Sequence, residues 1–210
     1  MFLWTASQMG LHPGARFVKC AAIVGDTIGK YHPHGDASVY AALVKTAGTL
    51  SENRKTWVQR NSLLPLIEGF GNFGDFLDSA AAMRYTEARL SKFASELMLD
   101  ADYLAVTPKV RNYSDTLDVP LYLPAKVPVM LLTGSSSMAV AVRGACPAFT
   151  FASLLPVLRR AAEFEISAKD CMKLVPTGTY GGRCISSAAD FGEFIKTGKG
   201  SLKYLPSYER

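Results

Sequence analysis

Residues 80–87 place an arginine directly before a tyrosine, Arg84 and Tyr85, after a run of three alanines. A tyrosine ordinarily has a pKa of about 10 and is a poor nucleophile at neutral pH. A neighbouring guanidinium can favour the phenolate and can also bind a phosphoryl oxygen, so this pair is suited to attack on a phosphate ester. The spacing is equally compatible with a surface arginine beside a packed tyrosine.

A second polar group lies between two candidate helices. Lys30, His32 and His34 come just before a helix N-terminus, where free N–H groups and the helix dipole already favour an anion. The alternative is a metal site, because His32, His34 and Asp36 alternate along the chain and can converge on one ion. A closed site needs further ligands, and the only other histidine, His12, lies upstream. We therefore expect a phosphate-binding turn and no metal site, with a metallohydrolase as the lesser alternative.

Two further patterns carry little chemistry. Asp100 and Asp102 have the spacing of a magnesium site, but they fall within an amphipathic pattern over residues 90–104, which predicts that they form its solvated C-terminal face. The cysteines form no C-x-x-C pair, so neither a zinc site nor a disulfide framework is indicated. They are Cys20, Cys146, Cys171 and Cys184.

The composition limits the class of protein. The 210 residues carry 23 basic and 18 acidic side chains, for a net charge of +5, and a pI near 9.0 mildly favours a polyanionic partner. The apolar run at residues 127–132 is interrupted by Pro128 and is far shorter than the ~20 residues of a membrane span. Residues 1–10 lack the features of a signal peptide, so a cytoplasmic location is expected.

The elements that must position these residues begin with two helices. Apolar spacing predicts a helix over residues 21–31, a turn at Pro33 and Gly35, and a second helix over residues 36–47. This arrangement resembles a helix-turn-helix. Residues 51–60 indicate a loop or hairpin, and residues 63–67 a strand. Glycines alternate with aromatic residues over 68–75, which predicts a turn-rich wing.

The residue pattern changes after the amphipathic helix, from helical spacing to short apolar runs. Residues 108–118 indicate a polar connector, and we place a domain boundary near Tyr122. Short apolar runs predict strands at residues 127–132 and 138–142. A helix is expected over residues 153–164 with Pro156 in its first turn, where proline is tolerated. Further strand candidates are residues 180–185 and 201–205.

Three strings together resemble a known family: residues 24–36, residues 71–74 and residues 81–90. In order, identity and spacing they are similar to the breakage-reunion subunit of type IIA DNA topoisomerases, which are the A subunits of DNA gyrase and topoisomerase IV. The resemblance continues through residues 124–128, 134–136 and 197–200, and so covers nearly the whole chain.

The resemblance implies an α+β fold, with a winged-helix DNA-binding and cleavage domain at residues 1–122 and the start of an α/β tower domain at residues 123–210. It implies that Tyr85 is the nucleophile that forms a 5′-phosphotyrosyl bond and that Arg84 steadies the charge on phosphorus. It implies that Lys30, His32 and His34 bind the backbone of the cleaved strand and that the helix of residues 36–47 recognises DNA. Where the family inserts an isoleucine into the base stack to bend DNA, this chain has Met138, which is long and apolar enough for the same role.

The resemblance also implies the partners. These are double-stranded DNA, a second copy of the A chain and two B subunits, in an A2B2 enzyme that acts in the cytoplasm on the nucleoid. Mg²⁺ would be held in trans by the TOPRIM domain of the B subunit, which would also bind ATP. Compared with the family, the chain starts within a helix and stops in the tower, without the exit gate or the wrapping domain that separates gyrase from topoisomerase IV. The alternative is a truncated or degenerate homologue that binds and bends DNA without catalysis.

Overall fold

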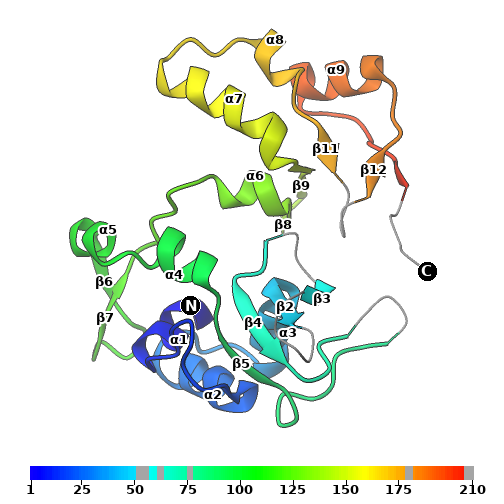
Figure 1. Ribbon diagram of the computed structural model, residues 1–210. Coiled ribbons are helices and arrows are strands. Elements are labelled where there is room, and N and C mark those ends of the chain that lie inside the picture. The colour runs from blue at the N-terminus through cyan, green and yellow to red at the C-terminus, as the bar shows by residue number, and fades with distance from the viewer. Residues whose placement is uncertain (51–56, 61–63, 75–77, 178–181, 206–210) are drawn as a thin grey trace. The chain divides into compact units, whose positions relative to one another are not determined.

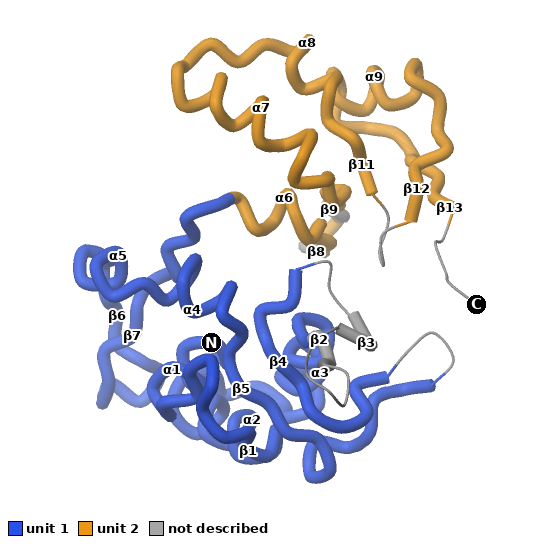
Figure 2. The backbone as a smooth tube through the Cα atoms, in the orientation of Figure 1, with its two compact units in different colours: residues 1–127 blue, residues 128–210 orange. Residues whose placement is uncertain are grey.

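The computed structural model describes residues 1–50, 57–60, 64–74, 78–177 and 182–205 (Figure 1). The chain divides into two compact units, residues 1–127 and 128–210 (Figure 2). Both units mix helices and strands, which confirms the predicted α+β class. The division falls between Val127 and Pro128, whereas the sequence places a boundary near Tyr122. In the described part of the chain no helix is long and apolar enough to cross a membrane.

Unit 1 is built on a five-stranded sheet with the strand order β1-β5-β4-β2-β3. The β2–β4 pair is parallel and the other pairs are antiparallel. A single core cluster joins the sheet to the helices and includes Leu3, Ile23, Leu43, Ile67 and Leu90. The elements of unit 1 are α1 (Phe2–Gln8), β1 (Val18–Lys19), α2 (Cys20–Lys30), α3 (Asp36–Thr46), β2 (Ala47–Leu50), β3 (Trp57–Arg60), β4 (Ile67–Phe70), β5 (Glu87–Leu90), α4 (Lys92–Met98), α5 (Ala101–Val106), β6 (Lys109–Arg111) and β7 (Asp118–Pro120).

The two helices predicted at residues 21–31 and 36–47 are confirmed as α2 and α3. Their apolar spacing works as expected, because Ile23 and Leu43 are fully buried in the core. Helix α2 is also tied to α1 by a buried polar contact. The Thr27 hydroxyl donates to the Ile23 carbonyl at 2.7 Å and lies 2.9 Å from the Thr5 hydroxyl. Within the loop or hairpin expected at residues 51–60, residues 57–60 form β3, which pairs with β2 of the preceding segment, and residues 51–56 lie outside the described residues.

The glycine-aromatic stretch differs from its prediction. The strand expected at residues 63–67 begins instead at Ile67, because Pro65 has no N–H to give to a ladder, and residue 63 lies outside the described residues. The strand then runs to Phe70, through residues expected to form a turn. Gly69 lies within β4, and this position requires glycine because the buried Phe73 ring packs across it. A Cβ at Gly69 would lie 2.6 Å from that ring.

Replacing Gly69 with alanine should therefore destabilise the protein. The Phe73 ring is 1% exposed and must shift to admit a methyl group, which costs about 1–3 kcal/mol of unfolding free energy. Gly25→Ala is the matched control, because Gly25 lies within α2 with nothing near its Cβ position, and alanine there should add about 0.5–1 kcal/mol. Urea unfolding of both variants is the measurement. Equal stabilities for the two variants would contradict this packing.

The single amphipathic helix predicted over residues 90–104 is two helices, α4 and α5, so that prediction is wrong. The chain turns at Leu99, and Asp100 caps α5 by accepting hydrogen bonds from the N–H groups of Asp102 and Tyr103. Its other oxygen accepts from Lys126 Nζ at 2.6 Å, and this hydrogen bond lowers the pKa of Asp100. Asp100 is therefore a helix cap and ion-pair partner. The apolar periodicity continued across the break and concealed it.

The prediction of a polar connector at residues 108–118 is also corrected. It forms a two-stranded hairpin, β6 paired with β7, in which Val110 lies opposite Val119. The Asn112 side chain organises the turn, since its Oδ1 accepts hydrogen bonds from the N–H groups of Thr116 and Leu117. The predominance of polar residues hid a turn that is held by side-chain hydrogen bonds.

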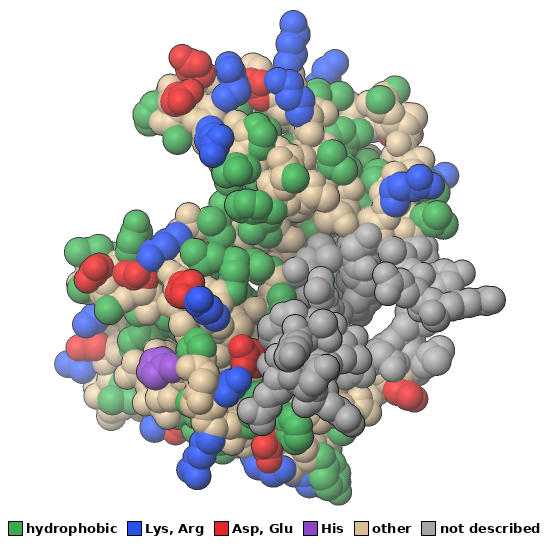
Figure 3. All heavy atoms as spheres, viewed as in Figure 1, with side chains coloured by type: hydrophobic (Ala, Val, Ile, Leu, Met, Phe, Trp, Pro, Cys, Tyr) green, Lys and Arg blue, Asp and Glu red, His purple; other side chains and the backbone are tan. Residues whose placement is uncertain are grey.

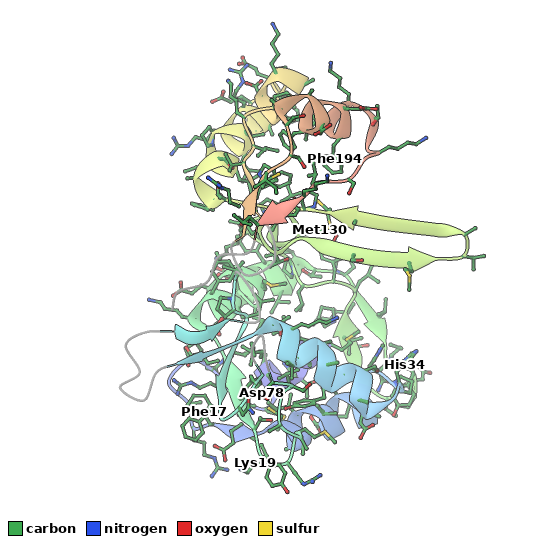
Figure 4. The ribbon with its side chains drawn as sticks, turned by 90° about the vertical axis from the view of Figure 1, so that its right-hand side faces the viewer. Phe17, Lys19, His34, Asp78, Met130 and Phe194 are labelled. Atoms are coloured by element: carbon green, nitrogen blue, oxygen red, sulfur yellow. The ribbon has the colours of Figure 1, made fainter. Side chains whose placement is uncertain are left out.

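Unit 2 contains a four-stranded antiparallel sheet, β10-β11-β12-β13, and a separate β8–β9 hairpin. Figure 4 shows this hairpin as a long two-stranded arm of unit 2. The elements are α6 (Val129–Thr133), β8 (Ser135–Ala139), β9 (Val142–Cys146), β10 (Ala148–Phe149), α7 (Phe151–Ala162), α8 (Ala168–Cys171), β11 (Pro176–Thr177), β12 (Arg183–Cys184), α9 (Ala188–Thr197) and β13 (Tyr204–Leu205).

Several predictions in unit 2 are corrected. The apolar run at residues 127–132 forms helix α6 and no strand, because a short apolar run fits either element and Pro128 occupies the N-cap position. The strand expected at residues 138–142 spans two strands and the turn between them. Pro156 lies beyond the first turn of α7, which begins at Phe151. Strands expected at residues 180–185 and 201–205 are confirmed only as β12 and β13, and residues 180–181 lie outside the described residues.

Candidate active site

Arg84 and Tyr85 lie in a tight turn, residues 83–85, that leads into β5. The Tyr85 N–H donates to the Ala82 carbonyl at 2.8 Å, which closes the turn. The Tyr85 side chain is 64% exposed, and the Arg84 guanidinium lies 4.6 Å from the centre of its ring. The turn therefore presents an accessible phenol with a cation directly beside it.

The N-terminus of α2 holds this turn at both of its ends. The Cys20 N–H donates to the Thr86 carbonyl at 2.9 Å, and the Ala21 N–H donates to the Met83 carbonyl at 3.1 Å. The turn is thus bonded to consecutive residues of one helix. Cys20 is fully buried there, and burial raises the pKa of its thiol to about 11. Cys20 is therefore a protonated packing residue.

His32 and His34 lie in the turn between α2 and α3. Their rings stack with centres 4.2 Å apart, and the His34 N–H donates to the His32 carbonyl at 2.7 Å. Figure 4 shows His34 at the end of α3 where that helix begins. Burial and, secondarily, the neighbouring His34 lower the pKa of His32, so its ring is neutral at pH 7. A neutral His32 imidazole can donate a hydrogen bond to an anion without carrying a fixed charge.

Lys30 is the third residue of this group, and its charge is not free. Its Nζ lies 2.7 Å from Asp26 Oδ1, one helical turn earlier, while its side chain stays half exposed. The ion pair raises the pKa of Lys30, so the ammonium stays protonated. Lys30 is thus a cation whose charge is already partly balanced. Figure 3 shows the same pattern more widely, since basic and acidic side chains lie interspersed over the visible face of unit 1.

Two residues that sequence reasoning missed hold the histidine turn in place. Asn112 Nδ2 donates to the Lys30 carbonyl at 2.7 Å, and the Tyr113 hydroxyl donates to the Gly29 carbonyl at 2.5 Å. The turn of the β6–β7 hairpin therefore caps the C-terminal carbonyls of α2 just before His32. The available sequence signal was an asparagine within a run of hydroxyl-bearing residues, which is typical of a side-chain-bonded turn.

The two groups of candidate residues lie at opposite ends of one helix. The N-terminus of α2 holds the Tyr85 turn, its C-terminus leads into the histidine turn, and its 11 residues span about 16 Å.

Met138 belongs to unit 2, where it lies in β8 and is 82% exposed. Among the described residues no three His, Cys, Asp or Glu side chains are grouped so that they could hold a metal ion.

Comparison with known proteins identifies the family. The family model for the A subunits of DNA gyrase and topoisomerase IV matches residues 2–210. The chain belongs to this family. The A subunit of DNA topoisomerase 4 from Neisseria gonorrhoeae is 37% identical over 214 residues, which cover 99% of this chain and 26% of that protein. The DNA gyrase A subunit of Campylobacter fetus is 39% identical over 208 residues, or 96% of this chain and 22% of that protein.

These matches confirm the resemblance stated from the motifs. Both the gyrase and the topoisomerase IV branches are represented at similar identity, so they do not distinguish the two branches. The chain spans about a quarter of the length of the curated relatives it matches.

The histidine stack leads to a titration experiment. His32 should titrate below the ordinary histidine value of about 6.5, because burial and a protonated neighbour both oppose its charged form. His34→Asn should move the pKa of His32 upward but leave it below 6.5, since burial is the larger cause. Imidazole NMR signals of the native protein and of His34→Asn, followed against pH, measure this directly. A His32 pKa above 6.5 in the native protein would contradict the observed environment.

Proposed function

We propose that this chain is the DNA-cleaving part of a type IIA topoisomerase that changes DNA topology together with a B subunit. The observation that carries the proposal is the Arg84–Tyr85 pair, held on an exposed turn in a member of the gyrase/topoisomerase IV A-subunit family. An accessible phenol beside a guanidinium is what attack on a phosphodiester requires. The enzyme would act in the cytoplasm on the nucleoid.

In the proposed reaction the Tyr85 oxygen attacks a DNA phosphorus and loses its proton. The new bond is a 5′-phosphotyrosyl ester, and the bond that breaks releases the 3′-hydroxyl, which takes up a proton. Arg84 stabilises the negative charge on the phosphoryl oxygens. The reverse attack by the 3′-hydroxyl reseals the strand, because the ester conserves the energy of the broken bond. Two copies of the chain acting on opposite strands would open the duplex.

The DNA would lie against the histidine turn and the start of α3. Within a winged-helix domain, α2, the turn and α3 form the helix-turn-helix, with α3 as the recognition helix. The exposed face of α3 suits close approach, because Ala37, Ser38, Ala41 and Ala42 are small. His32 and His34 would donate to backbone phosphates of the cleaved strand, and Lys30 would add a cation beside them.

Mg²⁺ and ATP are assigned to the partner. The described part of the chain groups no set of ligands for a metal, so the residues present do not fit a resident Mg²⁺, and no step above is routed through one. We propose that the TOPRIM domain of the B subunit holds the Mg²⁺, that the B subunit binds ATP, and that the complete enzyme is A2B2.

Substitution of Tyr85 tests the proposal. The chain is mixed with a topoisomerase IV B subunit, Mg²⁺ and supercoiled plasmid, and the reaction is quenched with SDS. We expect protein covalently attached to DNA 5′ ends for the native chain and none for Tyr85→Phe, because phenylalanine has no oxygen to form the ester. The matched control is Tyr122→Phe, which removes a hydroxyl from a similarly exposed tyrosine and should leave the adduct unchanged. DNA binding without any adduct from the native chain would favour the non-catalytic alternative.

Met138 provides a separate test for the proposed tower domain. Its side chain is exposed on the β8–β9 hairpin, and we propose that it inserts between base pairs and bends the duplex. Met138→Ala should reduce the bend, measured by energy transfer between dyes at the two ends of a short duplex. Met130→Ala removes a 56% exposed methionine from α6 in the same unit and serves as the control. Equal bending by the two variants would refute a wedge at position 138.

A further inference from the structure

The Tyr40 hydroxyl reaches from α3 to the segment that carries Tyr85. It donates to the Ala81 carbonyl at 2.6 Å and lies 2.8 Å from Thr86 Oγ1. These two contacts bracket residues 82–85, so both ends of the turn meet a single phenol oxygen. The Tyr40 ring packs against the core cluster of unit 1, and the hydroxyl makes an additional connection.

The direction of the two hydrogen bonds follows from counting protons. A phenol has one proton, and the geometry gives it to the Ala81 carbonyl. The Thr86 hydroxyl must therefore donate to the Tyr40 oxygen. Thr86 is fully buried, so its hydroxyl has no access to water. Ala81 is held on its other side as well, because its N–H donates to the Asn72 carbonyl at 3.0 Å.

The Tyr40 bonds differ in kind from the bonds made by α2. Cys20 and Ala21 hold the turn through backbone N–H groups, which every residue except proline supplies. Tyr40 holds it through a side chain, so the connection depends on residue type. Tyr40 also lies about one helical turn into α3, close to the histidine turn that precedes the helix. The hydroxyl therefore connects the helix that would face DNA with the turn that would attack it.

We propose that Tyr40 is a positioning residue that sets the place of Tyr85 relative to α3 without touching DNA. This inference rests on the proposed role of Tyr85 as the nucleophile. Burial raises the pKa of Tyr40, so its hydroxyl stays a protonated donor at neutral pH. Attack geometries tolerate little displacement, which is why a tether of this kind affects cleavage more than DNA binding.

The variants must separate positioning from stability. Tyr40→Phe keeps the ring but removes the oxygen to which the buried Thr86 hydroxyl donates, which destabilises the fold. The double variant Tyr40→Phe/Thr86→Val replaces both hydroxyls of the Tyr40–Thr86 hydrogen bond with apolar groups of similar shape, an exchange that can be nearly neutral. The Ala81 carbonyl also loses its donor, but Ala81 is only partly buried, so water can take the place of the Tyr40 hydroxyl. We expect the double variant to unfold at close to the native urea concentration although it lacks the tether. Tyr122→Phe is the control for removal of a tyrosine hydroxyl elsewhere in unit 1.

The first measurement needs no partner. Trypsin can cut after Arg84, which is exposed in the turn, and the new N-terminus at Tyr85 can be followed by mass spectrometry. In the double variant we expect this cut to be about 3- to 10-fold faster, in line with the loss of one or two neutral hydrogen bonds. The cut after the exposed Lys199, in unit 2, should keep its native rate. An unchanged rate after Arg84 would overturn the proposal.

The second measurement uses the B subunit, Mg²⁺ and plasmid. The double variant should bind DNA with native affinity but form about 3- to 10-fold less covalent complex than the native chain. Native amounts of covalent complex in the double variant would overturn the role of Tyr40 while leaving that of Tyr85 intact. If the native chain itself forms no covalent complex, the proposed function fails, and the trypsin measurement alone decides whether Tyr40 holds the turn.

Discussion

The hydrogen bond from the Cys20 N–H to the Thr86 carbonyl is the contact on which the rest of the candidate site depends. It continues the short β1–β5 ladder, in which Val18 lies opposite Ala88, into the first residue of α2. Strand pairing and helix start are thereby joined at one peptide. A shift of α2 along its axis would therefore either break this bond or displace the Tyr85 turn.

This constraint explains how an exposed nucleophile can also be well placed. Tyr85 and Arg84 project from the fold, while Thr86 and Ala88, which follow them closely in the chain, are fully buried. The reactive group thus lies on a short turn whose ends are fixed in the core, which is the arrangement that a precise site requires. At its other end α2 is fixed again, where Asn112 binds the Lys30 carbonyl. The same helix therefore supports both the attacking turn and the proposed phosphate-binding turn.

The parts of unit 1 that follow local rules could be predicted from the sequence. Helices α2 and α3 were predicted because their apolar residues recur at helical spacing between clear turn residues. The break at Asp100 and the start of β4 at Ile67 were missed, because apolar periodicity continues through the first and a proline two residues earlier delays the second. Helix α6 was predicted as a strand, since a short apolar run does not distinguish the two states.

The residues of the candidate site could also be predicted only in part. Arg84, Tyr85, His32 and His34 could be selected from residue type, spacing and family resemblance. The groups that hold them could not, because Asn112 and Tyr40 act through contacts with residues 82 and 41 positions away in the sequence. Long-range hydrogen bonds of this kind leave no periodic trace. The Asp26 partner of Lys30 was within reach, since acidic and basic residues four apart commonly pair on a helix.

The most direct test of the proposed chemistry is to find which protein atom becomes joined to DNA. A cleavage reaction with Mg²⁺ and a B subunit is quenched with SDS, the DNA is trimmed with nuclease, the protein is cut with trypsin, and the modified peptide is sequenced by mass spectrometry. We predict a 5′-linked nucleotide on the tyrosine of the peptide spanning residues 85–89. A nucleotide on any other residue, such as Tyr31 or Tyr40, would contradict the assignment of Tyr85 as the nucleophile.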